Sequence, residues 1–301
     1  MSNAKAVTFR KSPPHPALSP DGGEGGRRPG EGDSVPVTDA RPLLEVEALA
    51  ENLCDRKHRL TPPKSVWGRV GLNTQDALES FIARVSVNGD PPIYDVQTFP
   101  WAAKLEADWK KIRAELDQVM QYRDQMPSFQ DILKEVSTIQ TDNDWKTFFL
   151  AGIGMDCSEN AKRCPETMRL LGRIPGMKTA FFSILSPHKH IPAHRGAYNG
   201  VLRLHLGLLV PEPREKVRIR IGNDFRNWTE GKALIFDDTY NHEVWNDTDG
   251  YRVVLFVDFA RPLRQPWHWM NERFLSIGAF APFLREAGKK QAAWQKKFYK
   301  T

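Results

Sequence analysis

The chain has 301 residues, which suits one large domain or two small ones, and its 40% hydrophobic content is enough for a sizeable core. A net charge of +6 suits nucleic acid, an anionic membrane surface or small anionic substrates, and selects none of them. The three cysteines, Cys54, Cys157 and Cys164, are odd in number and lack CxxC spacing. This pattern excludes a disulfide framework and a zinc ribbon, and it favours a reducing cytoplasm.

Membrane-spanning and secretory segments are not expected. A bilayer span needs roughly 18 consecutive apolar residues, and the most apolar stretch, Val201 to Val210, is short and contains Arg203 and His205. The N-terminus has no apolar core of a signal peptide.

Residues 1–40 are expected to form a disordered tail. Lys11 to Pro36 contains six prolines and six glycines and hardly any large apolar side chain. We interpret it as a tail rather than a binding motif and exclude it from the fold.

Residues 41–176 are expected to form a helical lead-in and support region. The clearest helix is Ala103 to Met120, where apolar residues recur at helical spacing with Lys, Glu and Asp between them. Further helices are predicted at Arg41 to Asn52, at Ser128 to Val136 with a serine cap, and at Cys164 to Gly172 with Pro165 at the first helical position.

Residues 177–262 are expected to form the β half of the chain. Short apolar or alternating runs bounded by turn residues predict strands at Lys178 to Ser186, Val201 to Val210, Val217 to Ile221, Ala233 to Asp237 and Arg252 to Phe259. We predict a mainly β fold with α-helices: a double-stranded β-helix, or jelly roll, buttressed by N-terminal helices and by C-terminal helices in residues 263–301.

The β half also carries a constellation of polar residues. Alternation along Val201 to Val210 places leucines on one face and Arg203 and His205 on the other. His194 precedes this strand, His242 follows His194 by 48 residues, and Arg252 lies ten residues further on. Such spacing resembles the jelly-roll 2-oxoglutarate oxygenases; imidazole ligands suit non-haem Fe(II), and a guanidinium suits a carboxylate.

Several separated motifs strengthen the resemblance. In order along the chain, they resemble the aspartyl/asparaginyl β-hydroxylase family over about Lys178 to Pro262. The motifs are His194-Arg195-Gly196, Leu202-Arg203-Leu204-His205-Leu206-Gly207-Leu208, Trp228-Thr229-Glu230-Gly231-Lys232, Phe236-Asp237-Asp238-Thr239-Tyr240, His242-Glu243-Val244-Trp245 and Arg252-Val253-Val254-Leu255-Phe256-Val257-Asp258.

The resemblance implies an Fe(II)- and 2-oxoglutarate-dependent dioxygenase that uses O₂. It implies that His194 and His242 bind the iron. It also implies that Arg252 and Ser183 hold the distal carboxylate of 2-oxoglutarate, while the chelating end of the cosubstrate lies beside two residues of one strand, Arg203 and His205.

Gly196 departs from the wider oxygenase pattern, although not from this family. Most such enzymes have Asp or Glu two residues after the first histidine, completing a 2-His-1-carboxylate triad. We expect water in the third position and a metal affinity that depends on 2-oxoglutarate. On this hypothesis Gly196→Asp would supply a third ligand; the alternatives are halide at this position, as in related halogenases, or a carboxylate from Asp238.

The other histidines and the acidic pair near His242 have plainer interpretations. His188 and His190 are interpreted as solvated loop residues rather than a zinc site, and His268 as a packed residue of an amphipathic helix. Asp237 and Asp238 are interpreted as turn formers or hydrogen-bond partners rather than direct metal ligands.

The substrate is predicted to be lipid or peptide, and not nucleic acid. Four flanking motifs resemble the bacterial lipid A hydroxylases and favour the 2-position of a lipid acyl chain; the alternatives are a peptidyl aspartyl/asparaginyl β-hydroxylase and a noncatalytic jelly-roll module. Arginines and aromatic residues near the C-terminus would allow peripheral association with an anionic membrane at its cytoplasmic face. The flanking motifs are Tyr94-Asp95-Val96-Gln97-Thr98-Phe99-Pro100, Asp144-Trp145-Lys146-Thr147-Phe148-Phe149, Cys164-Pro165-Glu166-Thr167 and Arg261-Pro262-Leu263-Arg264; the C-terminal residues are Trp267, Trp269, Phe274 and Phe283 with Arg264, Arg273 and Arg285.

Overall fold

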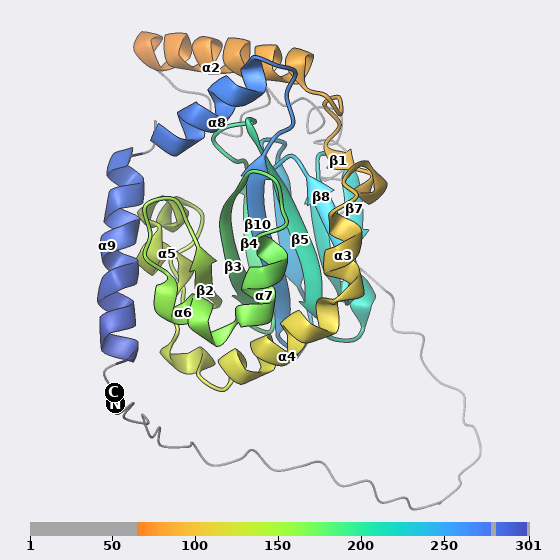
Figure 1. The fold of residues 1–301 in the computed structure, drawn as a ribbon, viewed down its shortest axis with the longest axis vertical. Coiled ribbons are helices and arrows are strands. Elements are labelled where there is room, and N and C mark those ends of the chain that lie inside the picture. The colour runs from red at the N-terminus through yellow and green to blue at the C-terminus, as the bar shows by residue number, and fades with distance from the viewer. Residues whose placement is uncertain (1–64, 278–280, 300–301) are drawn as a thin grey trace, which may run out of the picture.

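The computed structural model describes residues 65–277 and 281–299 (Figure 1). The tail expected at residues 1–40 and the helix expected at Arg41 to Asn52 lie outside the described residues.

The described chain is built on two antiparallel sheets that face each other. The larger has the strand order β1-β8-β5-β10-β3-β2 and the smaller β4-β9-β6-β7. This arrangement confirms the predicted jelly roll. The strands are β1 (Ile93–Tyr94), β2 (Trp145–Ala151), β3 (Met177–Leu185), β4 (Lys189–His194), β5 (Val201–Leu209), β6 (Val217–Ile221), β7 (Asp224–Asn227), β8 (Ala233–Phe236), β9 (His242–Asn246) and β10 (Arg252–Ala260).

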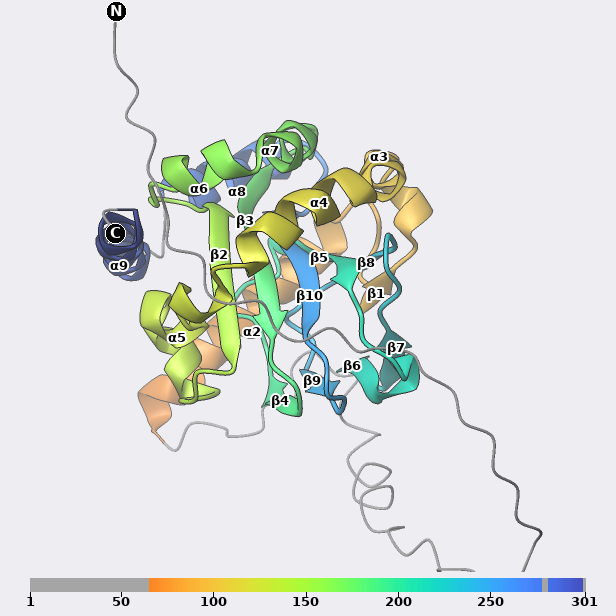
Figure 2. The ribbon, with the colours of Figure 1, turned by 90° about the horizontal axis from the view of Figure 1, so that it is seen from below.

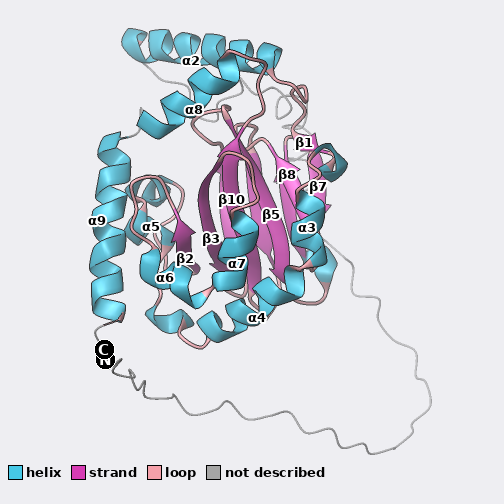
Figure 3. Ribbon diagram, in the orientation of Figure 1, coloured by secondary structure: helices cyan, strands magenta, loops and turns pink. Residues whose placement is uncertain are grey.

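Helices surround the sheets (Figure 3). Helices α3, α4 and α7 cover the outer face of the larger sheet, as the view from below shows (Figure 2), while α2 and α8 lie at one end of the molecule (Figure 1). The helices are α2 (Val66–Val85), α3 (Ala102–Ala107), α4 (Trp109–Met120), α5 (Phe129–Ile132), α6 (Ser158–Arg163), α7 (Pro165–Leu171), α8 (Trp267–Ile277) and α9 (Ala281–Phe298), with 3₁₀ turns at Val96–Thr98, Arg123–Gln125, Lys134–Thr138 and Arg214–Lys216.

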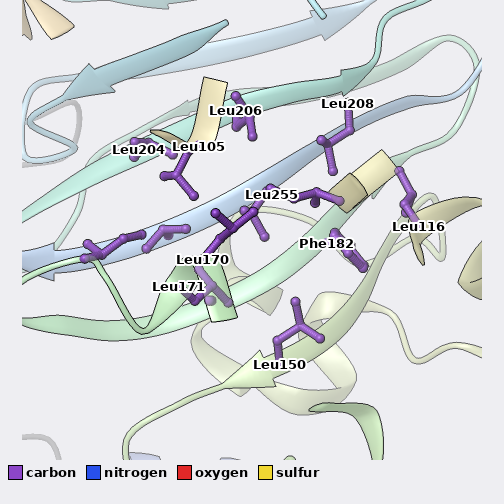
Figure 4. Packing of buried hydrophobic residues seen from close by; sticks show 14 of the residues in the cluster. Leu105, Leu116, Leu150, Leu170, Leu171, Phe182, Leu204, Leu206, Leu208 and Leu255 are labelled. Carbon is purple, nitrogen blue, oxygen red and sulfur yellow. The ribbon is translucent and has the colours of Figure 1, made fainter. Parts of the chain in front are cut away.

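Both faces of the larger sheet are buried: the outer face packs against helices and the inner face against the smaller sheet. The leucines of β5 point outward and pack against Leu105 and Leu116 of the covering helices and Leu170 of α7 (Figure 4). The inner face packs against the smaller sheet through residues such as Phe181 and Val244. Because Arg203 and His205 alternate with the leucines, they point into the space between the sheets.

Several predicted helices are confirmed with altered bounds. The segment Ala103 to Met120 is broken at Asp108 into α3 and α4. Ser128 forms the expected cap through a capping box with Asp131, but only a short helix follows before a 3₁₀ turn. Pro165 is the first residue of α7. Helix α2 was not predicted.

Three strands of the smaller sheet were also missed. The segment interpreted as a solvated loop around His190 is strand β4, and His242 opens β9. All four residues of β7 are exposed, so this strand carries no apolar alternation that a sequence pattern could reveal. The larger sheet also takes β1 and β2 from residues before 177.

No helix within the described ranges combines the length and apolar character needed to cross a membrane.

Candidate active site

Two adjacent strands bring His194 and His242 together. His194 ends β4, His242 begins β9, and the two residues pair with each other in the sheet. Their ring centroids lie 4.1 Å apart. The distant positions in the sequence thus become neighbours because β4 and β9 are antiparallel partners.

Both rings are oriented by hydrogen bonds to the backbone. Nδ1 of His194 donates to the carbonyl of Pro192 at 2.8 Å, and Nδ1 of His242 donates to the carbonyl of Tyr240 at 2.9 Å. A carbonyl oxygen only accepts, so Nδ1 carries the proton and Nε2 keeps the lone pair that a metal requires.

Burial favours the neutral form of both imidazoles. It lowers the pKa of His194 to about 4, against the opposing effect of the Pro192 carbonyl. It also lowers the pKa of His242 well below the usual value, and the neighbouring His194 adds to the shift. Neutral imidazole is the form that binds metal.

Arg203 lies at the same end of the interior. Its Nη2 contacts Oδ2 of Asp238 at 2.8 Å, and its Nε donates to Oδ1 of Asp258 at 2.9 Å. The guanidinium also lies 4.2 Å from the centre of the Phe256 ring. Arg203 is therefore already neutralised by two carboxylates, which the sequence analysis did not anticipate.

Arg252 is buried without such compensation. It begins β10, is only 1% exposed, and its guanidinium lies 4.5 Å from the centre of the Trp228 ring. In the described part of the chain, Nε and Nη1 find no hydrogen-bond partner. Burial lowers the pKa of Arg252 to about 9. A buried cation with unsatisfied donors is costly unless an anion joins it.

His205 lies between the two arginines along the interior face. The centroid of its ring lies 5.1 Å from the ring centroid of Phe256 and 5.9 Å from that of Trp228. Neither ring nitrogen has a hydrogen-bond partner among the described residues. Burial, reinforced by the nearby charges of Arg252 and Arg203, lowers the pKa of His205 well below its usual value.

Ser183 points into the same interior. It pairs with Val254 in β10, two pairs along the ladder from Arg252, so Ser183 and Arg252 point to the same face of the sheet. The buried hydroxyl accepts a hydrogen bond from Nε1 of Trp145 at 2.9 Å. Its own proton remains able to serve another acceptor.

Gly196 has no room for a side chain. A Cβ built at this position would overlap all three terminal atoms of the Asp238 carboxyl group, and the Gly196 amide donates to the Asp238 carbonyl at 2.7 Å. A side chain at position 196 would therefore have to displace the Asp238 carboxyl group, and the expectation that Gly196→Asp adds a ligand stays a prediction.

Asp238 itself contacts Arg203, and its Oδ1 has no partner in the described chain. Burial raises its pKa to about 6, despite the opposing charge of Arg203. Across the described residues, no three His, Cys, Asp or Glu side chains are grouped so as to hold a metal ion. This geometry fits two histidine ligands with a carboxyl group beside them.

A pocket of about 590 Å³ adjoins this polar cluster. Its polar end includes His194, Arg203 and Asp238. Away from that end the lining is mostly apolar and comes from α5, the following 3₁₀ turn, β2, α8 and α9. The apolar lining comprises Phe129, Leu133, Val136, Ile139, Phe149, Ile153, Met155, Phe181, Leu275 and Leu284.

Known proteins are similar in sequence to the part of the chain that contains this site. The family model for aspartyl/asparaginyl beta-hydroxylase matches residues 106–262. An ornithine lipid ester-linked acyl 2-hydroxylase of Rhizobium tropici is 53% identical over 251 residues, covering 79% of this chain and 89% of that relative. The chain belongs to the aspartyl/asparaginyl β-hydroxylase family.

Human aspartyl/asparaginyl beta-hydroxylase is a more distant member. It is 36% identical over 167 residues, which cover 54% of this hydroxylase but 21% of the human protein. These findings confirm the predicted family and the predicted enzyme class, a hydroxylating dioxygenase, over the noncatalytic module.

The interpretation of Asp237 as a turn former or hydrogen-bond partner is confirmed, whereas its buried ion-pair partner was not anticipated. Asp237, expected in a turn, accepts hydrogen bonds from the Thr239 amide and hydroxyl. It also forms a fully buried ion pair with Arg261. This pair secures the loop that leads to His242.

A second support connects α2 with both loops of the site. Arg195 donates from Nη2 to both carboxylate oxygens of Glu79 at 2.9 Å, and from Nε to the Thr239 carbonyl at 2.8 Å. Glu79 is buried. It was not identified from the sequence because helix α2, to which it belongs, was not predicted.

The other histidines of the described residues, His188, His190 and His268, lie outside this cluster. His190 is half-exposed and contacts Glu243 at 2.7 Å, while His188 contacts Asp249 at 2.8 Å. His268 lies in α8, as predicted.

Proposed function

We propose that this protein is an Fe(II)- and 2-oxoglutarate-dependent dioxygenase that hydroxylates the 2-position of a bacterial lipid acyl chain. The observation that carries the proposal is the largely apolar pocket that begins at His194 and Asp238. An acyl chain is the kind of ligand that a long apolar lining desolvates favourably, at about 25 cal/mol per Å² buried.

The residues present fit iron and 2-oxoglutarate. Nε2 of His194 and of His242 would hold the metal, because both Nδ1 atoms are committed to carbonyls. Arg252, with its unsatisfied buried donors, would bind the distal carboxylate together with Ser183. When bound, iron and 2-oxoglutarate together supply the activation of O₂ for insertion into a C–H bond.

The chain's own groups orient the reactants. Arg203, held by Asp258, would present a fixed guanidinium edge to the chelating end of the cosubstrate, beside His205. Asp238 would hold the water expected beside the two histidines, since its Oδ1 is buried without a partner in the described chain. The surrounding Phe256, Trp228 and Phe236 rings exclude bulk water.

The relative from Rhizobium tropici, named for an ester-linked acyl group, supports a lipid substrate. The name of the human relative supports the alternative, a peptidyl aspartyl or asparaginyl substrate. A peptide carboxylate or amide would leave most of the apolar pocket unfilled, so we favour the acyl chain. A lipid substrate would place the enzyme peripherally at the cytoplasmic face of an anionic membrane.

The test combines purified protein, Fe(II), 2-oxoglutarate and acylated lipids such as ornithine lipid. We expect succinate release and a lipid product heavier by one oxygen atom, both lost in His194→Ala and His242→Ala. The variant Leu133→Trp would narrow the pocket, reducing lipid turnover while leaving 2-oxoglutarate binding intact. Lipid turnover by Leu133→Trp at the wild-type rate, or hydroxylation of peptides alone, would overturn the acyl assignment.

A further inference from the structure

We propose that helices α2 and α8 form a docking surface that seats the enzyme on an anionic lipid bilayer and delivers the lipid directly to the pocket. The docking surface consists of Val70, Leu78, Phe81, Trp269, Met270 and Phe274, with Arg69, Arg84, Arg264 and Arg273 around them. This inference rests on the proposed lipid substrate, because it assigns the surface from which that substrate would be taken.

Large exposed apolar side chains are concentrated on these two helices. In the described chain, Val70 is 50% exposed, Leu78 43% and Phe81 37% along α2. Their spacing places them on one face of the helix, and the opposite face buries Glu79 and Ile82. The exposed apolar residues therefore lie on the solvent-facing side of a helix whose other side packs against the protein through Glu79 and Ile82.

Helix α8 continues the apolar surface. Trp269 is 62% exposed, Met270 48% and Phe274 38%. Beyond the two helices, the described residues expose only Val87 and Phe225 among large apolar side chains. Clustered apolar exposure of this kind marks an interaction site, whereas scattered single residues do not.

The two helices are joined where the end of α2 meets the start of α8 (Figure 1). The rings of Phe81 and Trp267 pack edge to face, with centroids 4.8 Å apart. The amide of Arg264 donates to the carbonyl of Val85 at 2.9 Å. Because a ring contact and a backbone hydrogen bond hold the two helices together here, their exposed apolar side chains form one surface at this end of the molecule.

The charge around the surface selects an anionic bilayer as the occupant. Arg69, Arg84, Arg264 and Arg273 are all exposed. The acidic groups of the same helices are largely committed inward: Glu79 is buried against Arg195, and Glu272 contacts Lys178 at 2.6 Å. Aromatic and aliphatic side chains rimmed by arginines are the pattern of a helix that lies in the headgroup region.

The surface also adjoins the pocket. Phe274 packs on the Tyr198 ring with centroids 5.2 Å apart, and Tyr198 lines the pocket together with Leu275 of α8. Asn271 fixes Tyr198 by accepting a hydrogen bond from its hydroxyl at 2.8 Å. An acyl chain drawn from a bilayer seated on α8 would thus reach apolar walls without crossing bulk water.

The test is flotation of the full-length protein with vesicles of phosphatidylcholine alone or mixed with phosphatidylglycerol. We expect binding to the mixed vesicles, with the partition coefficient falling at least about tenfold in Trp269→Ser/Met270→Ser and about tenfold in Arg69→Gln/Arg84→Gln. The matched control is Phe225→Ser, which removes a comparably exposed ring from β7 and should bind as wild type. Thermal melts establish that each variant is folded.

Detergent-dispersed lipid separates docking from catalysis. The surface variants should hydroxylate dispersed lipid at the wild-type rate while losing turnover on vesicles. If wild type binds vesicles but hydroxylates no lipid, the docking surface stands and the proposed function fails. Equal vesicle binding by wild type and both surface variants would overturn the docking surface, as would a dimer in solution that the Trp269→Ser/Met270→Ser change dissociates.

Discussion

At the scale of single residues, Arg252 is the group whose environment most needs a ligand. It is buried, lies against Trp228, and has donors that no described residue satisfies. The other interior arginine, Arg203, has carboxylate partners. The two cations therefore differ in role. Arg203 is held by carboxylates of the protein, whereas the donors of Arg252 that lack a partner in the described chain are available to a bound anion.

Arg252→Gln should weaken 2-oxoglutarate binding by at least about 100-fold, because losing the partner of a buried carboxylate costs about 3–5 kcal/mol. Calorimetric titration in the presence of Mn(II) measures the effect, and the affinity for Mn(II) measured without 2-oxoglutarate should change little. Arg218→Gln, at a half-exposed arginine paired with Asp247, is the control. Unchanged binding in Arg252→Gln would show that another cation holds the distal carboxylate.

Gly196 and Asp238 act as a steric unit. Gly196→Ala should force the Asp238 carboxyl group away from Arg203 and lower the affinity for Mn(II) measured with 2-oxoglutarate present. The displaced carboxyl group should also make Gly196→Ala less stable than wild type. The double variant Gly196→Ala/Asp238→Ala lacks the carboxyl group that the new Cβ would overlap, so it should recover that lost stability. Gly71→Ala, where a Cβ meets nothing within 4 Å, controls for the substitution itself. A single variant as stable and as metal-competent as wild type would contradict this steric account.

At the scale of elements, the loop between β8 and β9 is positioned by a buried ion pair. Arg261 and Asp237 are both completely buried, and Asp237 also organises the Thr239 turn. The strand β9 that follows begins with His242. The loop's geometry is therefore set by charges that lie outside the strands.

Arg261→Met should lower the free energy of unfolding by about 3–5 kcal/mol, since it removes the guanidinium that forms an ion pair with the buried Asp237 carboxylate. Denaturant titration measures the loss. Arg264→Met, at a nearby exposed arginine, should change stability by less than about 0.5 kcal/mol. Equal stability of the two variants would contradict a stabilising role for the ion pair between Arg261 and Asp237.

At the scale of the whole molecule, the site lies between two sheets and joins ligands from both. The smaller sheet contributes His194 and His242, while the larger contributes Arg203, His205, Arg252 and Ser183. A metal bound only by two histidines would be held weakly, whereas a metal chelated together with 2-oxoglutarate would connect the two sheets.

Mn(II) and 2-oxoglutarate together should therefore raise the melting temperature more than the sum of their separate effects. At about 100 times the dissociation constant, bound ligand adds about 2.7 kcal/mol, equivalent to an increase on the order of 5 °C. His194→Ala should abolish the synergy. A full increase with Mn(II) alone would instead indicate that a carboxylate, Asp238 first among them, completes the metal site.

Much of this protein was determined by local sequence pattern. The alternation in β5 predicted a strand with leucines on one face and Arg203 and His205 on the other, because side-chain direction in a strand follows directly from residue spacing. Local pattern also predicted the apolar strands β3, β6 and β10, the start of α5 at the Ser128 cap and the start of α7 at Pro165. Ordered motifs likewise sufficed to predict the family.

Only the tertiary structure decided how these parts meet. Strands β4, β7 and β9 are formed by pairing rather than by apolar pattern, and β4–β9 pairing is what brings the two histidines together. Gly196 looked like an open coordination position until Asp238, forty-two residues away, proved to fill its space. The sequence also could not show that Arg203 is paired with carboxylates while Arg252 has donors without a partner among the described residues. Burial and charge pairing depend on contacts between residues distant in the sequence.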